Sequence, residues 1–136
     1  MKLAVDSNIL FSFFRKGSQT RKIIATIESF ELCTLKSRID ELIEHRDEIC
    51  AKARIGPEDF MKTLSEIEVF VEVIDDSLAF DMAREARKIA PHEEDAPLFA
   101  LALKLGCGIW SNEKAFKRQT KVKVLDTTEM TEILES

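Results

Sequence analysis

The stretch that decides the fold is DAPLFALALKLGCGIWSNE, residues Asp95–Glu113. Its first part, as far as Leu105, is apolar almost all round, which predicts a largely buried helix with Asp95 as its N-cap. Its second part contains the short apolar run Gly108–Ser111, which predicts a strand covered on both faces. A buried helix followed closely by a buried strand is typical of an α/β domain with a parallel sheet.

The rest of the chain repeats this alternation. Short apolar runs predict four more strands: Lys2–Asp6, Phe30–Leu35, Val69–Ile74 and Val122–Leu125. Helical patterns separate them: Ser7–Phe14, Ser18–Ser29, Ser37–Arg54, Pro57–Glu68 and Ser77–Ala90. Because a parallel crossover needs a dozen or more residues, these long connections favour parallel pairing. Ser37, with Asp40 three residues later, resembles a capping box at the start of its helix.

The length and composition indicate one soluble globular domain that spans residues 1–136. Hydrophobic residues make up 45% of the chain and charged residues 33%, which excludes a disordered protein. Cys33, Cys50 and Cys107 are odd in number and lack CxxC spacing, so we expect buried, reduced thiols in a cytoplasmic protein. No apolar run approaches the ~20 residues that span a bilayer, and Asp6 comes too early for a signal peptide.

The net charge of −5 argues against a passive nucleic-acid coat, but the basic residues are unevenly distributed. Ser7–Ile27 contains no acid, and neither does Lys114–Lys123. The basic residues of these two islands are Arg15, Lys16, Arg21 and Lys22, and Lys114, Lys117, Arg118, Lys121 and Lys123. Such islands can contact phosphates, although solvated helix faces explain the charge pattern equally well.

Several other chemistries are not indicated. His45 and His92 have no partner at zinc-ligand spacing, and no P-loop, GxGxxG or GxSxG motif occurs. Trp110 is expected in the core of its strand. For Phe11, Phe13 and Phe14 a core position is favoured over base stacking, because they lie in a helical pattern.

Carboxylates gather where the predicted strands end. The first strand ends in Asp6-Ser7-Asn8 and the fourth in Ser111-Asn112-Glu113, and ligands of open parallel sheets bind at these carboxyl ends. Asp95 and Glu41, at the starts of their helices, can join them, although helix N-termini also favour acids for purely structural reasons. Asp6 lies between apolar segments, where a carboxylate is costly unless it is paired, hydrogen-bonded or metal-bound.

Such a cluster has a natural cation. Neighbouring carboxylates repel one another, and their pKa values rise unless a cation intervenes. Mg²⁺ and Mn²⁺ prefer oxygen ligands and leave room for water and phosphate. A bound ion of this kind suits phosphodiester hydrolysis without a side-chain nucleophile.

Three segments resemble the motifs of PIN-domain nucleases. Leu3–Leu10 is similar to the first motif, Asp40-Glu41-Leu42 to the second, and Asp95–Glu113 to the third and fourth. The resemblance extends over essentially the whole chain. It implies a three-layer fold with a five-stranded parallel sheet in the order 3-2-1-4-5, metal-dependent cleavage of RNA and frequent homodimers. Many small members are VapC-type toxins that a small antitoxin protein holds inactive.

Carried over residue by residue, the resemblance makes Asp6, Glu41, Asp95 and Glu113 the catalytic, Mg²⁺- or Mn²⁺-binding acids. Glu113 stands where the family more often has Asp, and Asp40 replaces Glu41 if the helix register differs. The expected polar supports and substrate contacts are Ser7, Asn8, Asn112, Arg15, Lys117 and Arg118.

Three alternatives stay open on the sequence alone. A receiver-like phosphoacceptor domain is favoured by Asp75-Asp76 after the third strand but disfavoured by the number of helical patterns. A phosphatase with an aspartate nucleophile would need an acid at Asn8. A catalytically weak or inactive PIN fold that serves as a binding scaffold is the strongest of the three, because of Glu113 and the overall acidity.

Overall fold

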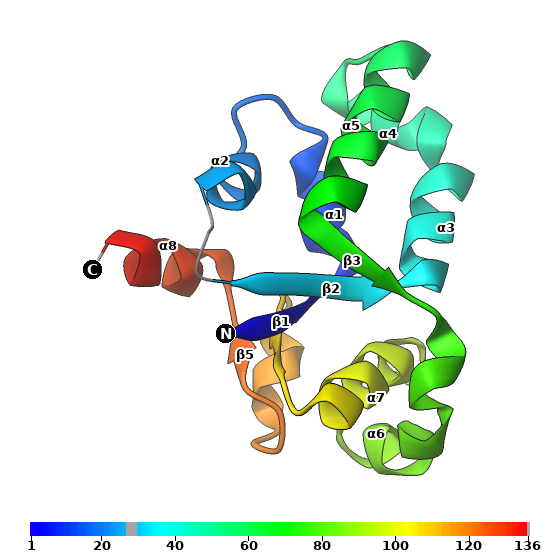
Figure 1. The fold of residues 1–136 in the computed structure, drawn as a ribbon, viewed down its shortest axis with the longest axis vertical. Coiled ribbons are helices and arrows are strands. Elements are labelled where there is room, and N and C mark those ends of the chain that lie inside the picture. The colour runs from blue at the N-terminus through cyan, green and yellow to red at the C-terminus, as the bar shows by residue number, and fades with distance from the viewer. Residues whose placement is uncertain (27–29, 136) are drawn as a thin grey trace.

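The centre of the molecule is a sheet of parallel strands in the order β3-β2-β1-β4-β5 (Figure 1). The computed structural model describes residues 1–26 and 30–135. Within them the strands are β1 (Lys2–Val5), β2 (Glu31–Leu35), β3 (Val71–Ile74), β4 (Gly108–Trp110) and β5 (Val124–Leu125). The predicted strand order and parallel pairing are confirmed.

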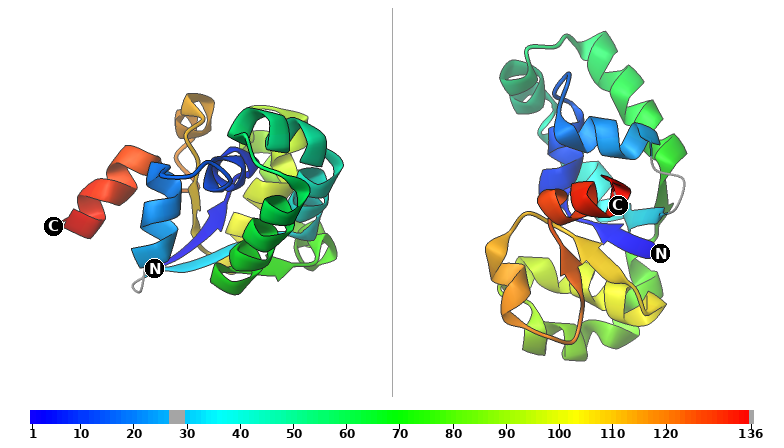
Figure 2. Two further views of the ribbon diagram at one scale, coloured as in Figure 1. Left: turned by 90° about the horizontal axis from the view of Figure 1, so that it is seen from above. Right: turned by 90° about the vertical axis from the view of Figure 1, so that its left-hand side faces the viewer.

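Helices cover both faces of this sheet (Figures 1 and 2). The first layer consists of α1 (Ser7–Phe13), α2 (Gln19–Thr26), α3 (Lys36–Glu44), α4 (Arg46–Ala53), α5 (Pro57–Phe70) and α8 (Thr127–Glu135). The second consists of the 3₁₀ helix η1 (Asp76–Met82), α6 (Ala83–Ile89), α7 (Ala96–Leu105) and the 3₁₀ helix η3 (Lys114–Arg118). A short 3₁₀ turn, η2 (Glu93–Asp95), leads into α7. The predicted three-layer α/β fold is therefore confirmed.

Each inner strand supplies apolar side chains to both layers. In β1, Leu3 and Val5 face the first layer and Ala4 faces the second. In β4, Trp110 faces the first and Ile109 the second. All five are at most 1% exposed, which explains why both strands read as continuous apolar runs. Trp110 is a core residue as predicted, and its Nε1–H donates to Thr127 Oγ1 at 3.1 Å.

The position of β1 determines where a site can form. β1 pairs with β2 on one side and with β4 on the other, so the winding of the chain reverses at this strand. The carboxyl ends of β1, β2 and β4 and the helices that follow them meet at one edge of the sheet, where open parallel sheets bind ligands.

The predicted helix Ser37–Arg54 is wrong as a single element. The chain forms α3 and α4 with a break at His45, whose φ of −96° and ψ of 18° leave the helical region. The proposed capping box is also wrong, because Leu35 is the N-cap and Ser37 lies inside the first turn. Ser37 Oγ instead donates to Asp76 Oδ2 at 2.5 Å. Periodicity alone did not reveal this distant partner.

Other boundaries also differ from the prediction, and β5 starts at Val124 rather than at Val122. Val69 and Phe70, expected in a strand, form the exposed last turn of α5, which ends where Val71 becomes buried. The expected helix Ser77–Ala90 starts as the 3₁₀ helix η1 and becomes α-helical only at Ala83. The last residues of the expected helix Ser18–Ser29, residues 27–29, lie outside the described part of the chain.

The C-terminal helix α8 was not predicted. Its start is marked by reciprocal capping, in which the Glu129 amide donates to Asp126 Oδ1 and the Asp126 amide donates to Glu129 Oε1. Met130 then enters the first-layer core. The cysteines follow expectation in part: Cys33 is buried, Cys50 and Cys107 are half-buried, and none forms a disulfide within the described residues.

Candidate active site

Asp6 lies at the reversal point, immediately after β1, and is the N-cap of α1. Its Oδ1 accepts a hydrogen bond from the Ser7 amide at 2.8 Å, and its Oδ2 accepts one from Ser111 Oγ at 2.8 Å. The Asp6 amide donates to Trp110 O at 3.1 Å. Only 8% of the residue is exposed. The carboxylate is therefore fixed between the ends of β1 and β4.

The environment of Asp6 disfavours its charged form. Burial raises the pKa of its carboxyl above the ordinary value, and the negative charge of Asp95 raises it further. The hydrogen bonds from Ser111 and Ser7 and the charge of Arg38 oppose this shift without cancelling it. A buried carboxylate with a raised pKa at this edge is typical of a functional group.

Glu41 reaches the same edge from α3. Its Oε2 accepts a hydrogen bond from Ser7 Oγ at 3.2 Å, and its Oε1 pairs with Arg38 Nη1 at 3.2 Å. Ser7 thus links the two acids, because its amide binds Asp6 and its hydroxyl binds Glu41. Asp40 instead pairs with Lys36 on the exposed side of α3. The structure therefore favours the predicted register, in which Glu41 and not Asp40 belongs to the site.

Arg38 is a cation inside this group of acids. Its side chain is 11% exposed, its Nη2 donates to Glu94 O at 2.8 Å, and its charge acts on both Asp6 and Asp95. Its Nε is buried and has no hydrogen-bond partner among the described residues. Arg38 therefore bridges α3 and η2 and neutralises part of the carboxylate charge.

Asp95 completes the group from the start of α7. It is the N-cap as predicted, but its side chain makes no capping hydrogen bond, so capping does not explain this carboxylate. Its Oδ2 lies 3.4 Å from His92 Nδ1. Burial raises the pKa of the Asp95 carboxyl, and Glu94 adds to the increase, whereas His92 and Arg38 lower it.

The fourth predicted acid does not join these three. The Glu113 amide donates to Ser111 Oγ at 3.1 Å, so its backbone is tied to the site. Its side chain is exposed, and within the described residues its carboxylate has no hydrogen-bond or ion-pair partner. Asn112 Oδ1 accepts from the Thr127 amide and so helps to begin α8, while Asn8 is exposed on α1.

The basic residues expected to contact substrate differ in their surroundings. Lys117 pairs with Asp126 at 2.9 Å and with Glu129, and these carboxylates raise its pKa. Arg118 is exposed at the end of η3. Arg15 is exposed beyond the end of α1 and has no side-chain partner in the described part of the chain. Of these three, Arg15 and Arg118 are available to a phosphate, whereas Lys117 is already engaged.

The donor chemistry of the site fits Mg²⁺ or Mn²⁺. Asp6, Glu41 and Asp95 offer carboxylate oxygens, which are the ligands that these two ions prefer. Over residues 1–26 and 30–135, however, no three acidic, histidine or cysteine side chains already converge at metal-ligand spacing. Metal binding would therefore require side chains of this edge to turn inward.

Sequence reasoning missed Arg38 and the contact of Ser111 with Asp6. Arg38 stands one turn before Glu41, at the i, i+3 spacing of a helical ion pair, which is the one sequence signal for it. The bond from Ser111 to Asp6 joins residues 105 positions apart, and no local pattern predicts it.

Comparison with known proteins identifies the family. The model of the PIN domain matches residues 4–135, and the chain belongs to this family. Curated protein sequences gave no match. Among solved structures, the chain is similar to one described as VapBC2 from Rickettsia felis bound to a DNA fragment from their promoter. The TM-score is 0.68 at 15% identity, and the alignment covers 93% of this chain and 98% of that one. The receiver and phosphatase alternatives are therefore wrong.

Proposed function

We propose that the protein is a metal-dependent endoribonuclease that hydrolyses RNA phosphodiester bonds. The observation that supports this most directly is the buried Asp6 carboxylate, which is fixed by Ser7 and Ser111 with Glu41 and Asp95 beside it. Membership of the PIN-domain family supports a nuclease as the general class. We assign the three acids as the ligands of Mg²⁺ or Mn²⁺. Glu113 would become a fourth ligand only if its exposed side chain rotated toward them.

Different residues of the chain would bind the metal, position the ligands and contact the RNA. Asp6 is held in one orientation by two hydrogen bonds, so it can bind an ion without first being ordered. The Ser7 hydroxyl fixes the Glu41 carboxylate relative to Asp6. A bound Mg²⁺ or Mn²⁺ lowers the pKa of a water molecule and neutralises charge on a phosphodiester oxygen. Asn8 and Arg118, both exposed, are proposed to contact the RNA.

Cleavage of an RNA pool tests this function. The pool contains structured and single-stranded RNA. Wild type and Asp95→Asn are each incubated with it in the presence of Mn²⁺, Mg²⁺ or EDTA. Glu93→Gln, which changes an exposed acid two residues away, is the matched control. We expect metal-dependent cutting by wild type and by Glu93→Gln but not by Asp95→Asn. Absence of cutting in every metal would contradict the proposal.

The second candidate is a PIN fold without catalytic activity that serves as a binding scaffold. It is favoured by Arg38, which already pairs with Glu41, and by the lack of a convergent three-ligand set in the described residues. A scaffold would bind RNA or protein without cutting, and Mn²⁺ would not change its thermal stability. Metal-dependent cleavage lost in Asp95→Asn would exclude it.

Protein partners are also part of the proposal. The resemblance to VapC toxins implies a small antitoxin, and the solved structure named VapBC2 has the same fold. A homodimer is supported by large apolar side chains exposed around the edge strand β3: Val69, Phe70, Val73, Leu78 and Phe80. Analytical ultracentrifugation of wild type and Val73→Glu would test the dimer.

A cytoplasmic location fits the three free thiols. Within residues 1–26 and 30–135, no helix has the length and apolar character needed to cross a bilayer.

A further inference from the structure

The outer face of α1 forms a stripe that starts beside the acids. α1 turns Ile9, Leu10 and Phe13 into the core and leaves Asn8, Phe11 and Ser12 at least partly exposed. These three positions follow the i, i+3, i+4 spacing of one helical face, and exposed Arg15 lies just beyond the C-terminal end of the helix. Because Asp6 caps the N-terminus of α1, the stripe leads from the site toward Arg15.

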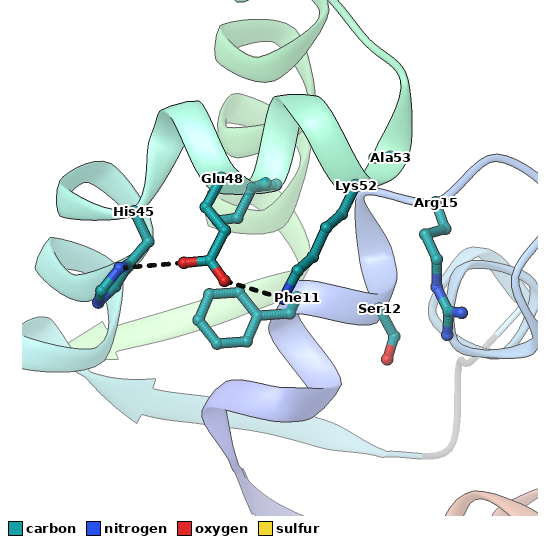
Figure 3. A pocket seen from close by; sticks show the side chains of 8 residues that line it. Phe11, Ser12, Arg15, His45, Glu48, Lys52 and Ala53 are labelled. Carbon is teal, nitrogen blue, oxygen red and sulfur yellow. Dashed lines mark ion pairs between the residues drawn. The ribbon is translucent and has the colours of Figure 1, made fainter.

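Two cavities open along this stripe and share Ser12 and Arg15. The larger, of about 490 Å³, lies between α1 and α4 (Figure 3). Its lining residues are Phe11, Ser12, Arg15, His45, Glu48, Ile49, Lys52 and Ala53. The smaller, of about 360 Å³, lies between the loop after α1 and the start of α8. Its lining residues are Ser12, Arg15, Lys16, Gly17, Ser18, Thr20, Asn112 and Thr127.

The smaller cavity has the chemistry of an anion site. Its lining contains the cations Arg15 and Lys16, four hydroxyl groups and the Asn112 amide, and no carboxylate among the described residues. Within the described residues, neither cation has a side-chain partner to compete with a ligand. Asn112 places this cavity next to the acids, because it directly follows Ser111, which binds Asp6. A phosphate in this cavity would therefore lie near the acidic site, because one of its ligands, Asn112, is adjacent in sequence to the residue that binds Asp6.

The larger cavity has a flat apolar wall. Phe13 and Phe14 are 2% and 1% exposed, whereas Phe11 is only half-buried and its ring lines the cavity (Figure 3). The one carboxylate in the lining, Glu48, is paired with Lys52 at 2.8 Å and with His45 at 3.6 Å (Figure 3). The Lys52 ammonium thus offsets its negative charge. An accessible aromatic ring beside a cation is the platform on which single-stranded nucleic acids stack their bases.

We propose that single-stranded RNA lies along the outer face of α1. One phosphate next to the scissile bond binds in the smaller cavity to Arg15, Lys16 and Asn112, and one base stacks on Phe11 in the larger cavity. The inference rests on the proposed function for the identity of the ligand. It adds to the acids a binding track, which is the outer face of α1 with its two cavities, and a site for one base. RNA is the favoured occupant because the described lining of the smaller cavity has cations and no acid, as a phosphate requires.

Binding is measured in the Asp95→Asn background, so that cleavage does not consume the probe. The probe is a single-stranded RNA of about 12 nucleotides with a 2-aminopurine at each position in turn. Arg15→Gln/Lys16→Gln tests the phosphate site, and Phe11→Leu, which keeps an apolar side chain, tests the base site. Arg84→Gln on α6 and Met61→Leu on α5 are matched controls, because both residues are exposed and line neither cavity.

The double glutamine variant should bind about tenfold more weakly, and the slope of its salt dependence should fall by about 0.7, as expected for one phosphate that is no longer neutralised. Phe11→Leu should abolish the quenching of one 2-aminopurine. The control variants should match the parent. If the parent binds RNA but all three substitutions leave affinity and quenching unchanged, the proposed track is wrong, and the two cavities bind another occupant, such as a protein partner.

The two proposals fail separately. If wild type cuts RNA while Arg15→Gln/Lys16→Gln and Phe11→Leu bind normally, only the track is overturned. If wild type never cuts RNA but these variants bind it more weakly, the nuclease proposal is overturned and the track is supported on a binding scaffold. A parent that binds no RNA would overturn the track.

Discussion

Arg38 Nη1 lies 3.2 Å from Glu41 Oε1, one turn away on α3, and the same guanidinium reaches Glu94 O at 2.8 Å. The acids of a PIN-type site are therefore balanced in part by a cation that belongs to the protein. A divalent ion bound by these acids would share the carboxylate charge with Arg38 and be repelled by it. The affinity for metal would then depend on a residue that is not itself a ligand.

Arg38→Gln should bind Mn²⁺ several-fold more tightly than wild type, because the repelling charge is gone. Its metal-free form should be less stable by about 1–2 kcal/mol, because the hydrogen bond to Glu94 O is weakened or lost. Isothermal titration with Mn²⁺ and urea unfolding in EDTA measure the two effects. Arg84→Gln is the control for charge alone. Weaker Mn²⁺ binding would instead make Arg38 a residue that assembles the ligands.

Asp6→Asn should abolish cleavage and yet raise the stability of the metal-free protein at about pH 7. The pKa of Asp6 is raised in the fold, so its contribution to stability is present at low pH and is lost as pH rises through the folded-state pKa. Asparagine removes that penalty. Thermal denaturation in EDTA over a range of pH measures this, with exposed Asp40→Asn as the control. A variant less stable than wild type at every pH would contradict the prediction.

Ser111→Ala should shift the acidic limb of the pH–cleavage profile to higher pH. The Ser111 hydroxyl donates to Asp6 Oδ2 and lowers the pKa of that carboxyl, so its removal leaves Asp6 protonated over a wider range. Single-turnover cleavage rates as a function of pH measure the shift. Ser65→Ala, an exposed hydroxyl on α5, should leave the profile unchanged. A profile that keeps its position while the rate falls would indicate a purely structural role.

Gly108→Ala should destabilise the sheet between β4 and β5. A Cβ at this position would lie 2.8 Å from Lys123 O and 3.1 Å from Leu3 Cδ2, and the backbone carbonyl can move only if β5 moves. We expect a loss of about 1–3 kcal/mol in urea unfolding. At Gly56 an added Cβ meets no atom within 4 Å, so Gly56→Ala should cost less than about 1 kcal/mol, chiefly as a poorer N-cap for α5. Equal effects at the two positions would refute this explanation.

The sequence predicted the features that depend on apolar patterning along short segments. Both buried strands and the buried helix α7 follow from runs such as Leu98–Leu103, and the acids could be placed because they stand at the ends of these elements. The break at His45 was not predictable in the same way, since apolar spacing continues through it. Glu113 shows the limit for the site, because it follows β4 as expected but its exposed side chain has no partner among the described residues.

Partners distant in sequence account for the remaining differences. Ser37 looked like a cap, but it binds Asp76 from another layer. Lys117 looked free to meet a phosphate, but Asp126 and Glu129 at the start of α8 engage it. In both cases the sequence pattern indicated a role within its own segment. The actual hydrogen-bond or ion-pair partner comes from a different element and is evident only in the folded structure.

The direct passage from β1 into α1 through Asp6 has a mechanical consequence. With no loop between them, the position of Asp6 is set by the buried side chains of the strand and of the inner face of the helix. Under the proposed track, substitutions on the outer stripe should therefore alter which RNA binds while leaving Asp6 in place. Directed evolution of substrate preference should begin at Phe11, Ser12 and Arg15, which are all at least partly exposed.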